Sequence, residues 1–213
     1  MIKIIPSILA KTPEEFEKMI RMVEPYVDRV QLDIADGDFV STKTISGYEE
    51  LKKIETKVEF DVHLMVSRPE DQMYFWYETK ASRFLIHAET DHGHASLIDQ
   101  IHFNGKKAGL VLNPETQIEK ITELIDGIDF VQFMTVAPGF YGSQFEESVI
   151  NKILEFHGQY PSVPIFADGG INPETILRLI AVGVTSFVVG SYIMKSPDVG
   201  KAIEELSKMS NNY

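Results

Sequence analysis

The chain has 213 residues with no cysteine and six histidines, and its 32 acidic and 20 basic side chains give a formal net charge of −12. Without cysteine, it cannot carry a disulfide framework, a zinc finger, an iron–sulfur cluster or a catalytic thiol. The acidic surplus argues against a nucleic-acid binder, whose affinity rests on Lys and Arg, and against adhesion to an anionic membrane.

The N-terminal segment is a short apolar run that Pro6 interrupts and that acidic residues follow. A secretory signal needs a longer uninterrupted apolar core. A membrane-spanning helix needs roughly 20 apolar residues, which no stretch of this chain approaches. We therefore expect a cytoplasmic protein that does not associate with a membrane.

Short β-branched or aromatic runs alternate with segments of helical periodicity along the whole chain. The predicted strands are 2–5, 28–34, 58–65, 83–87, 107–112, 129–134, 163–168 and 185–190. The predicted helices include 13–26, 69–80, 117–125, 173–183 and 197–209. Eight nearly continuous apolar strands separated by helices indicate an α/β fold, a single (β/α)8 TIM barrel over residues 1–213. A doubly wound sheet is disfavoured, because PSILAKT follows the first strand in place of a Gly-rich loop.

Polar side chains stand at the carboxyl ends of several predicted strands, where the active site of such a barrel gathers. Gln31 and Asp33 share one face of the second strand by the period of two, His63 and Met65 share one face of the third, and Asp168 ends the seventh. A carboxylate or imidazole that faces the interior is costly unless it is paired or bound to a ligand. The pattern therefore predicts a functional site at this end of the barrel.

Glycines follow the last three strands, at 139 and 142, at 169–170, and at 190 before Ser191. Glycine lets backbone N–H groups approach an anion, and the N-termini of the following helices favour negative charge. Many barrels hold a phosphate group after strands seven and eight. The glycines therefore indicate a phosphate site beside the polar cluster.

Six strings along the chain resemble those of ribulose-phosphate 3-epimerases, in the same order and spacing. They are PSILA (6–10), LDIADGDFV (32–40), DVHLMV (61–66), LVLNPET (110–116), MTVAPGFYGSQF (134–145) and ADGGI (167–171). The resemblance implies a (β/α)8 barrel isomerase that inverts C3 of a phosphorylated ketose through a cis-enediolate. It also implies a role in the pentose phosphate pathway and assembly as a homo-oligomer.

The resemblance also implies roles for individual residues. Asp33 and Asp168 match the two acid/base catalysts, and with His63 they match three of four ligands of a divalent metal ion such as Zn, Fe, Mn or Mg. The residues implied to bind substrate are Ser7, His63, Met65, Met134, Gly139, Gly142, Gly169, Gly170, Gly190 and Ser191. His87 and Glu89 match a His-x-Glu pattern outside the metal ligands, which we interpret as a supporting or packing pair.

Three departures from the family pattern lie on the second strand and the loop after it. Gln31 stands where the family has the fourth metal ligand, a histidine; Ala35 replaces a methionine, and STK (41–43) replaces Pro-Asn. Three interpretations of Gln31 stay open: an oxygen ligand for a loosely bound Mn²⁺ or Mg²⁺, a hydrogen-bonding group in a metal-free site, or the mark of an inactive sugar-phosphate binder.

The expected reaction interconverts D-ribulose 5-phosphate and D-xylulose 5-phosphate. The alternatives are a 3-epimerase of a hexulose 6-phosphate, such as D-allulose 6-phosphate, and a catalytically silent relative that binds sugar phosphates. Decarboxylases and aldolases on related barrels are disfavoured, because their Asp-x-Lys-x-x-Asp motif has no counterpart and His63 stands where its lysine would be.

Overall fold

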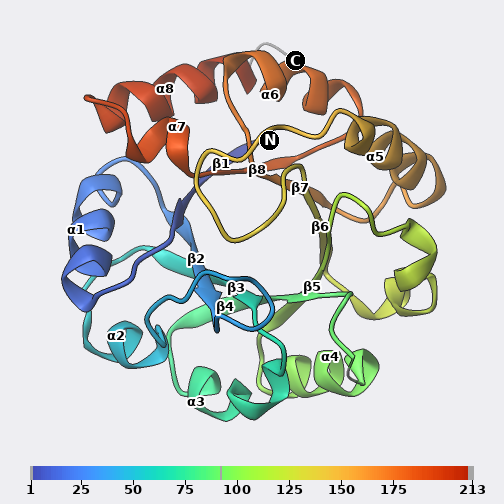
Figure 1. The fold of residues 1–213 in the computed structure, drawn as a ribbon, viewed down its shortest axis with the longest axis horizontal. Coiled ribbons are helices and arrows are strands. Elements are labelled where there is room, and N and C mark those ends of the chain that lie inside the picture. Colours follow the sequence, from blue (N-terminus) through green and yellow to red (C-terminus); the bar gives the residue numbers. More distant parts are fainter. Residues whose placement is uncertain (1, 92, 211–213) are drawn as a thin grey trace.

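The computed structural model describes residues 2–91 and 93–210. Eight parallel strands pair in chain order and close into a barrel, with the helices around the outside (Figure 1). The strands are β1 (Lys3–Ile8), β2 (Arg29–Ala35), β3 (Glu59–Met65), β4 (Ala81–His87), β5 (Lys107–Leu112), β6 (Phe130–Met134), β7 (Ile165–Asp168) and β8 (Ser186–Val189). The predicted (β/α)8 barrel is confirmed.

The outer layer consists of eight α-helices and two 3₁₀-helices in the described part of the chain. These are α1 (Pro13–Val23), α2 (Tyr48–Lys53), η1 (Pro69–Asp71), α3 (Met73–Tyr77), α4 (His94–Phe103), η2 (Ile118–Gly127), α5 (Ser148–Gln159), α6 (Pro173–Ala181), α7 (Ser191–Met194) and α8 (Val199–Ser210). None of the described helices is both long enough and apolar enough to cross a bilayer.

Two predicted helices differ from the observed elements. The predicted helix over 69–80 is divided into η1 and α3, and the one over 117–125 is the 3₁₀-helix η2. In η2 the buried side chains are Ile118, Ile121 and Ile125, and Leu124 is partly buried beside them.

The helices predicted over 13–26 and 173–183 begin after the capping residues Thr12 and Asn172, which stand directly before the predicted starts. The Thr12 hydroxyl accepts a hydrogen bond from the N–H of Glu15, and the Asn172 side chain accepts from Glu174 and Thr175. In both helices a proline follows the cap. Its missing N–H costs nothing at this position, because the first N–H groups of a helix have no acceptor within the helix.

The main core lies between the barrel and the helices and includes Trp76, Phe16 and Phe156. A second apolar cluster consists of Ile5, Leu85, Val111, Phe130, Met134, Phe166 and Val188, contributed by six strands. Because alternate residues of a strand face the same side, these positions line the barrel interior. Several stand two residues before a polar residue, so the cluster forms an apolar floor below the polar end of the barrel.

Candidate active site

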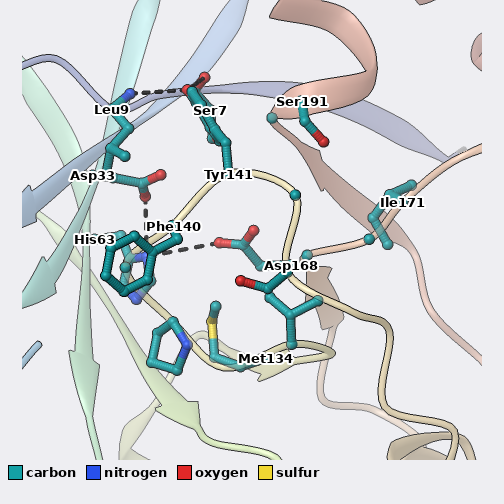
Figure 2. Close-up of a pocket in the computed structure, with 18 of the residues that line it drawn as sticks. Ser7, Leu9, Asp33, His63, Met134, Phe140, Tyr141, Asp168, Ile171 and Ser191 are labelled. Carbon is teal, nitrogen blue, oxygen red and sulfur yellow. Dashed lines mark hydrogen bonds and ion pairs between the residues drawn. The ribbon is translucent and has the colours of Figure 1, made fainter. Parts of the chain in front are cut away.

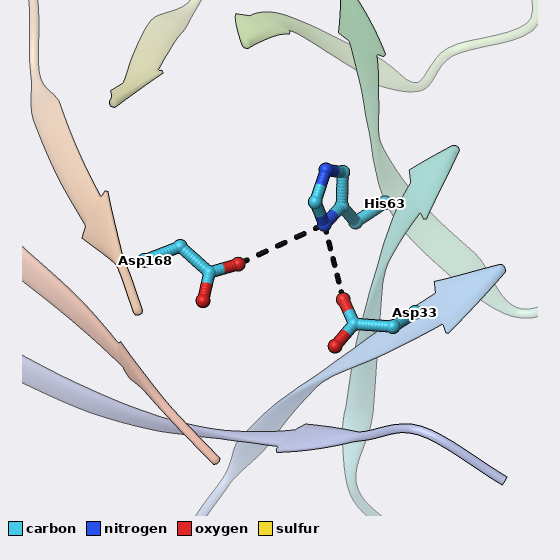
Figure 3. Close-up of side chains that lie close together, drawn as sticks. All are labelled: Asp33, His63 and Asp168. Carbon is cyan, nitrogen blue, oxygen red and sulfur yellow. Dashed lines mark hydrogen bonds and ion pairs between the residues drawn. The ribbon is translucent and has the colours of Figure 1, made fainter. Parts of the chain in front are cut away.

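Three predicted residues meet at the carboxyl end of the barrel. Asp33 and His63 are paired in the register of β2 and β3, and Asp168 ends β7 across the barrel. His63 Nδ1 lies 3.1 Å from Asp33 Oδ1 and 3.7 Å from Asp168 Oδ2 (Figure 3). One ligand atom from each residue falls within 4.8 Å of the others, so this buried cluster can hold a divalent metal ion.

Gln31 inserts its amide group into this cluster. Its Nε2 donates to Asp33 Oδ1 at 2.9 Å and to Asp168 Oδ2 at 2.7 Å, and lies 3.3 Å from His63 Nδ1. The amide nitrogen faces the carboxylates because an amide oxygen there would meet only other acceptors. The Gln31 Oε1 atom is buried and has no hydrogen-bond partner among the described residues.

Gln132 on β6 is a fifth polar residue of the site, which was not predicted from the sequence. Its Nε2 donates to Asp168 Oδ2 at 3.1 Å, and its Oε1 is buried without a partner in the described chain. The available signal was its position two residues before Met134, which places both on the inner face of the strand. Asp168 is therefore held by two neutral amides.

These surroundings shift the pKa of Asp168. Burial raises the pKa of this carboxyl to about 7, and the negative charge of Asp33 adds to the rise. His63 and the hydrogen bonds from Gln31 and Gln132 act in the opposite direction without cancelling it. Asp168 can therefore hold a proton near neutral pH, which is what general acid catalysis requires.

A pocket above the cluster is lined by every residue that the resemblance implied for substrate binding (Figure 2). Besides Asp33, His63 and Asp168, its wall contains Ser7, Met65, Met134, Gly139, Gly142, Gly169, Gly170, Gly190 and Ser191. Gln31 is absent from this wall, because its amide lies among the cluster residues. The structure thus brings the predicted metal, acid/base and phosphate residues into one cavity.

The glycines at one side of the pocket are needed for close packing. Gly169 has φ +110°, and a side chain there would collide with Val136. A Cβ atom at Gly190 would lie 2.5 Å from the ring of Tyr141. Glycine therefore keeps the backbone accessible at this side of the pocket.

The loop of residues 135–147, between β6 and α5, crosses the barrel mouth and covers the pocket (yellow in Figure 1). The hydroxyl of Tyr141 holds it there by donating to the Ser7 carbonyl at 2.7 Å and accepting from the Leu9 N–H at 3.0 Å (Figure 2). Burial raises the pKa of Tyr141, so the hydroxyl keeps its proton. This contact could not be predicted from the sequence, because loop residues carry no periodic signal.

His87 and Glu89 stand directly behind His63. His87 Nε2 lies 2.9 Å from His63 Nε2, and His87 Nδ1 lies 3.0 Å from Glu89 Oε2. Burial lowers the pKa of His87 to about 4. Burial alone would raise the pKa of Glu89, but hydrogen bonds from His87 and from the Asn113 N–H lower it to about 2. At neutral pH the pair is therefore a neutral imidazole beside a carboxylate.

The other two departures lie at the edge of this site. Ala35 is buried at the end of β2 beside Met65, and its N–H donates to the Thr44 hydroxyl at 2.9 Å. Of residues 41–43, Lys43 forms an isolated antiparallel bridge with Asp36. Neither position belongs to the pocket wall.

Comparison with known proteins gives a consistent result. Residues 3–194 match the model of the ribulose-phosphate 3 epimerase family. A ribulose-phosphate 3-epimerase of Bacillus subtilis is 36% identical over 97% of this chain and 98% of its own length. The cytoplasmic isoform of Oryza sativa subsp. japonica is 34% identical over 97% and 93%. The structure of 3-hexulose-6-phosphate synthase from Salmonella typhimurium matches with a TM-score of 0.74 over 99% of both chains, and its 15% identity shows the shared fold alone.

Proposed function

Since the chain belongs to the ribulose-phosphate 3-epimerase family, we propose that it interconverts D-ribulose 5-phosphate and D-xylulose 5-phosphate by inverting C3. The observation that carries this proposal is the pair of buried carboxylates, Asp33 and Asp168, on opposite sides of one pocket beside His63. Epimerisation removes a proton from one face of a carbon next to a carbonyl and returns one to the other face, which needs two such groups.

In the proposed mechanism one aspartate takes the C3 proton, and the electron pair of the broken C–H bond forms a cis-enediolate. The other aspartate then gives a proton to the opposite face of C3. Asp168 supplies the acid in one direction, because its raised pKa of about 7 lets it hold a proton at neutral pH. In the reverse direction the two carboxylates exchange roles.

The donor set of the cluster fits a divalent metal ion. Asp33, His63 and Asp168 supply three ligand atoms, and the unpartnered Oε1 of Gln31 is a fourth acceptor of the kind that Mn²⁺ or Mg²⁺ accepts. A bound ion would stabilise the negative charge of the enediolate. Because Gln31 Nε2 already donates to both carboxylates, these bonds must break before its oxygen can turn inward. We therefore expect weak metal binding, and weaker for Zn²⁺ or Fe²⁺ than a fourth imidazole would give.

The phosphate group of the substrate is assigned to the glycine-lined side of the pocket. Gly142, Gly169, Gly170, Gly190 and Ser191 line the pocket, and Figure 2 shows Ser191 on the opposite side of it from His63. Backbone N–H groups at these positions bind an anion without a cationic side chain, so the net charge of −12 is no obstacle. Ser7, Met65 and Met134 line the region for the sugar carbons.

The deciding experiment is solvent deuterium incorporation at C3 of D-ribulose 5-phosphate, followed by NMR. We expect incorporation with the wild-type chain and its loss in Asp33→Asn and in Asp168→Asn. Faster deuterium exchange into D-allulose 6-phosphate would indicate that the substrate is a hexulose 6-phosphate. Binding of both sugar phosphates without any exchange would overturn it in favour of a silent binder.

We further propose that residues 1–213 act as one domain and assemble as a homo-oligomer in the cytoplasm. Analytical ultracentrifugation of the full chain measures the oligomeric state, and a monomer at every concentration would contradict that part of the proposal.

A further inference from the structure

A line of hydrogen bonds runs from the backbone just after β5 to the imidazole of the site. The Asn113 N–H donates to Glu89 Oε1 at 2.8 Å, and Glu89 Oε2 lies 3.0 Å from His87 Nδ1. His87 Nε2 lies 2.9 Å from His63 Nε2, and both rings are fully buried. The chain of contacts ends at His63 Nδ1, which faces Asp33 and Asp168.

The Glu89 carboxylate at the outer end of this line determines which atom donates in each hydrogen bond. A carboxylate can only accept, so His87 Nδ1 carries the hydrogen that it shares with Glu89. A neutral imidazole has one N–H, so His87 Nε2 is left with a lone pair. His63 Nε2 must then carry a hydrogen, because two lone pairs at 2.9 Å would repel each other. The complete burial of His87 disfavours its cationic form.

We infer that Glu89, acting through His87, is a positioning residue that fixes His63 in its Nε2–H tautomer. His63 Nδ1 then presents a lone pair 3.1 Å from Asp33 Oδ1 and 3.7 Å from Asp168 Oδ2. The Gln31 amide offsets the repulsion among these three acceptors, because its Nε2 donates to both carboxylates and lies 3.3 Å from His63 Nδ1. Three converging acceptors are an arrangement that a shared proton or a cation stabilises. The tautomer is a property of the free chain, and only its effect on turnover rests on the proposed function.

The isosteric variant Glu89→Gln tests the direction directly. The Asn113 N–H requires an acceptor, so the new amide oxygen stays with Asn113 and the amide nitrogen faces His87. His87 Nδ1 must then accept, its Nε2 must donate, and His63 must carry its hydrogen on Nδ1. One O-to-N replacement thus reverses donor and acceptor in both remaining bonds of the line, from residue 89 to His87 and from His87 to His63.

The measurement is long-range ¹H–¹⁵N NMR of the imidazole rings at neutral pH, in the full chain treated with a chelator and without substrate. His63 is assigned by the loss of its signals in His63→Asn. We expect the Nε2–H tautomer in the wild type and in Glu119→Gln, which removes an exposed charge, and the Nδ1–H tautomer in Glu89→Gln. A secondary readout is Mn²⁺ affinity, expected to fall about 10–100-fold in Glu89→Gln.

An Nδ1–H tautomer of His63 in the wild type would overturn the inference, whether or not Glu89→Gln folds. An unchanged His63 tautomer in a folded Glu89→Gln would overturn it as well. Failure of the deuterium-exchange experiment would instead remove the proposed function and leave the tautomer result standing, so the two failures are distinguishable.

Discussion

The two ends of the barrel both bury charged side chains, but they treat them in opposite ways. At the amino end Asp61 is 1% exposed and forms ion pairs with Arg29 and Arg83. At the carboxyl end Asp33 and Asp168 lie beside neutral amides and an imidazole, with no Lys or Arg ion pair among the described residues. In the first cluster the arginines neutralise the negative charge of Asp61. In the second cluster no cationic side chain among the described residues neutralises the two carboxylates in this way.

The same strands build both ends. Arg29 and Asp33 belong to β2, and Asp61 and His63 belong to β3. The cluster with paired charges and the cluster with unpaired carboxylates are therefore only two or four residues apart along a strand. The apolar floor lies between them, and none of the described hydrogen bonds or ion pairs links the two clusters. Changes at one end should therefore add independently to changes at the other. We therefore expect the amino end to serve stability and the carboxyl end to serve the proposed chemistry.

The largest expected effect comes from Asp168→Asn, which removes charge at the mouth. Loss of this acid/base group should lower kcat by about 10²–10⁴-fold. The new amide oxygen can still accept from Gln31 and Gln132, so we expect the fold to be kept. Steady-state kinetics tests this, with exposed Asp126→Asn as the control.

The same variant should be more stable than the wild type at alkaline pH. The folded chain holds the Asp168 proton with a pKa of about 7, above the ordinary 3.8. The folded state therefore binds this proton more tightly than the unfolded state, and the free energy of unfolding falls as pH rises from about 4 to about 7. Urea unfolding at pH 5 and pH 8 measures this. A wild type that gains stability relative to Asp168→Asn on going to pH 8 would contradict the sign.

The next effect is Asp61→Asn at the amino end, where charge removal should destabilise. Arg29 and Arg83 would lose their buried partner, which typically costs about 3–5 kcal/mol. Urea unfolding gives the change in free energy, and kcat per folded molecule should stay at the wild-type level. The matched control is Glu59→Gln, because Glu59 pairs with Arg29 but its side chain is 59% exposed; we expect less than about 1 kcal/mol there. Equal losses in both variants would break the comparison.

A smaller effect is expected from Gln31→His, which restores an imidazole to the mouth. It replaces the amide donor that links Asp33 to Asp168 by a strong metal ligand, so the affinity for Zn²⁺ should rise at least about tenfold. Isothermal titration after chelator treatment measures the gain. Unchanged affinity would show that Gln31 is not what limits metal binding.

The smallest effect is expected from Tyr141→Phe, which loosens the cover of the mouth. The variant keeps the ring against Gly190 but loses two hydrogen bonds, one to Ser7 of β1 and one to Leu9 just after it, each contributing about 1 kcal/mol. We expect KM to rise by up to about tenfold with a smaller change in kcat. The structural readout is faster hydrogen exchange of the Leu9 amide, and unchanged protection there would contradict the assigned contact.

Periodicity in the strands accounts for how much could be predicted from sequence. Because alternate residues share a face, Asp33, His63 and Asp168 could be placed together once eight parallel strands were recognised. The helix starts at Thr12 and Asn172 were predictable because capping is local chemistry. The (β/α)8 barrel could be predicted from these local patterns alone.

The missed features depend on distant neighbours. Gln132 is neutral and lies within an apolar strand, so nothing in DFVQFM (129–134) marks it as a partner of Asp168. Tyr141 contacts β1 through a loop path that only the closed barrel determines. The direct contact of His87 with His63 required the register of β3 against β4, which a pattern of hydrophobic residues leaves open.

The Gln31–Asp168 hydrogen bond joins residues 137 positions apart in the chain. Bonds of such long range form late in folding, because the entropy of closing the intervening loop must be overcome first. Asp33, His63 and His87 lie in the first half of the chain, whereas Asp168 arrives only with β7. Regain of enzymatic activity during refolding should therefore lag behind the return of helical circular dichroism, and turnover becomes a kinetic marker for the moment at which the barrel closes.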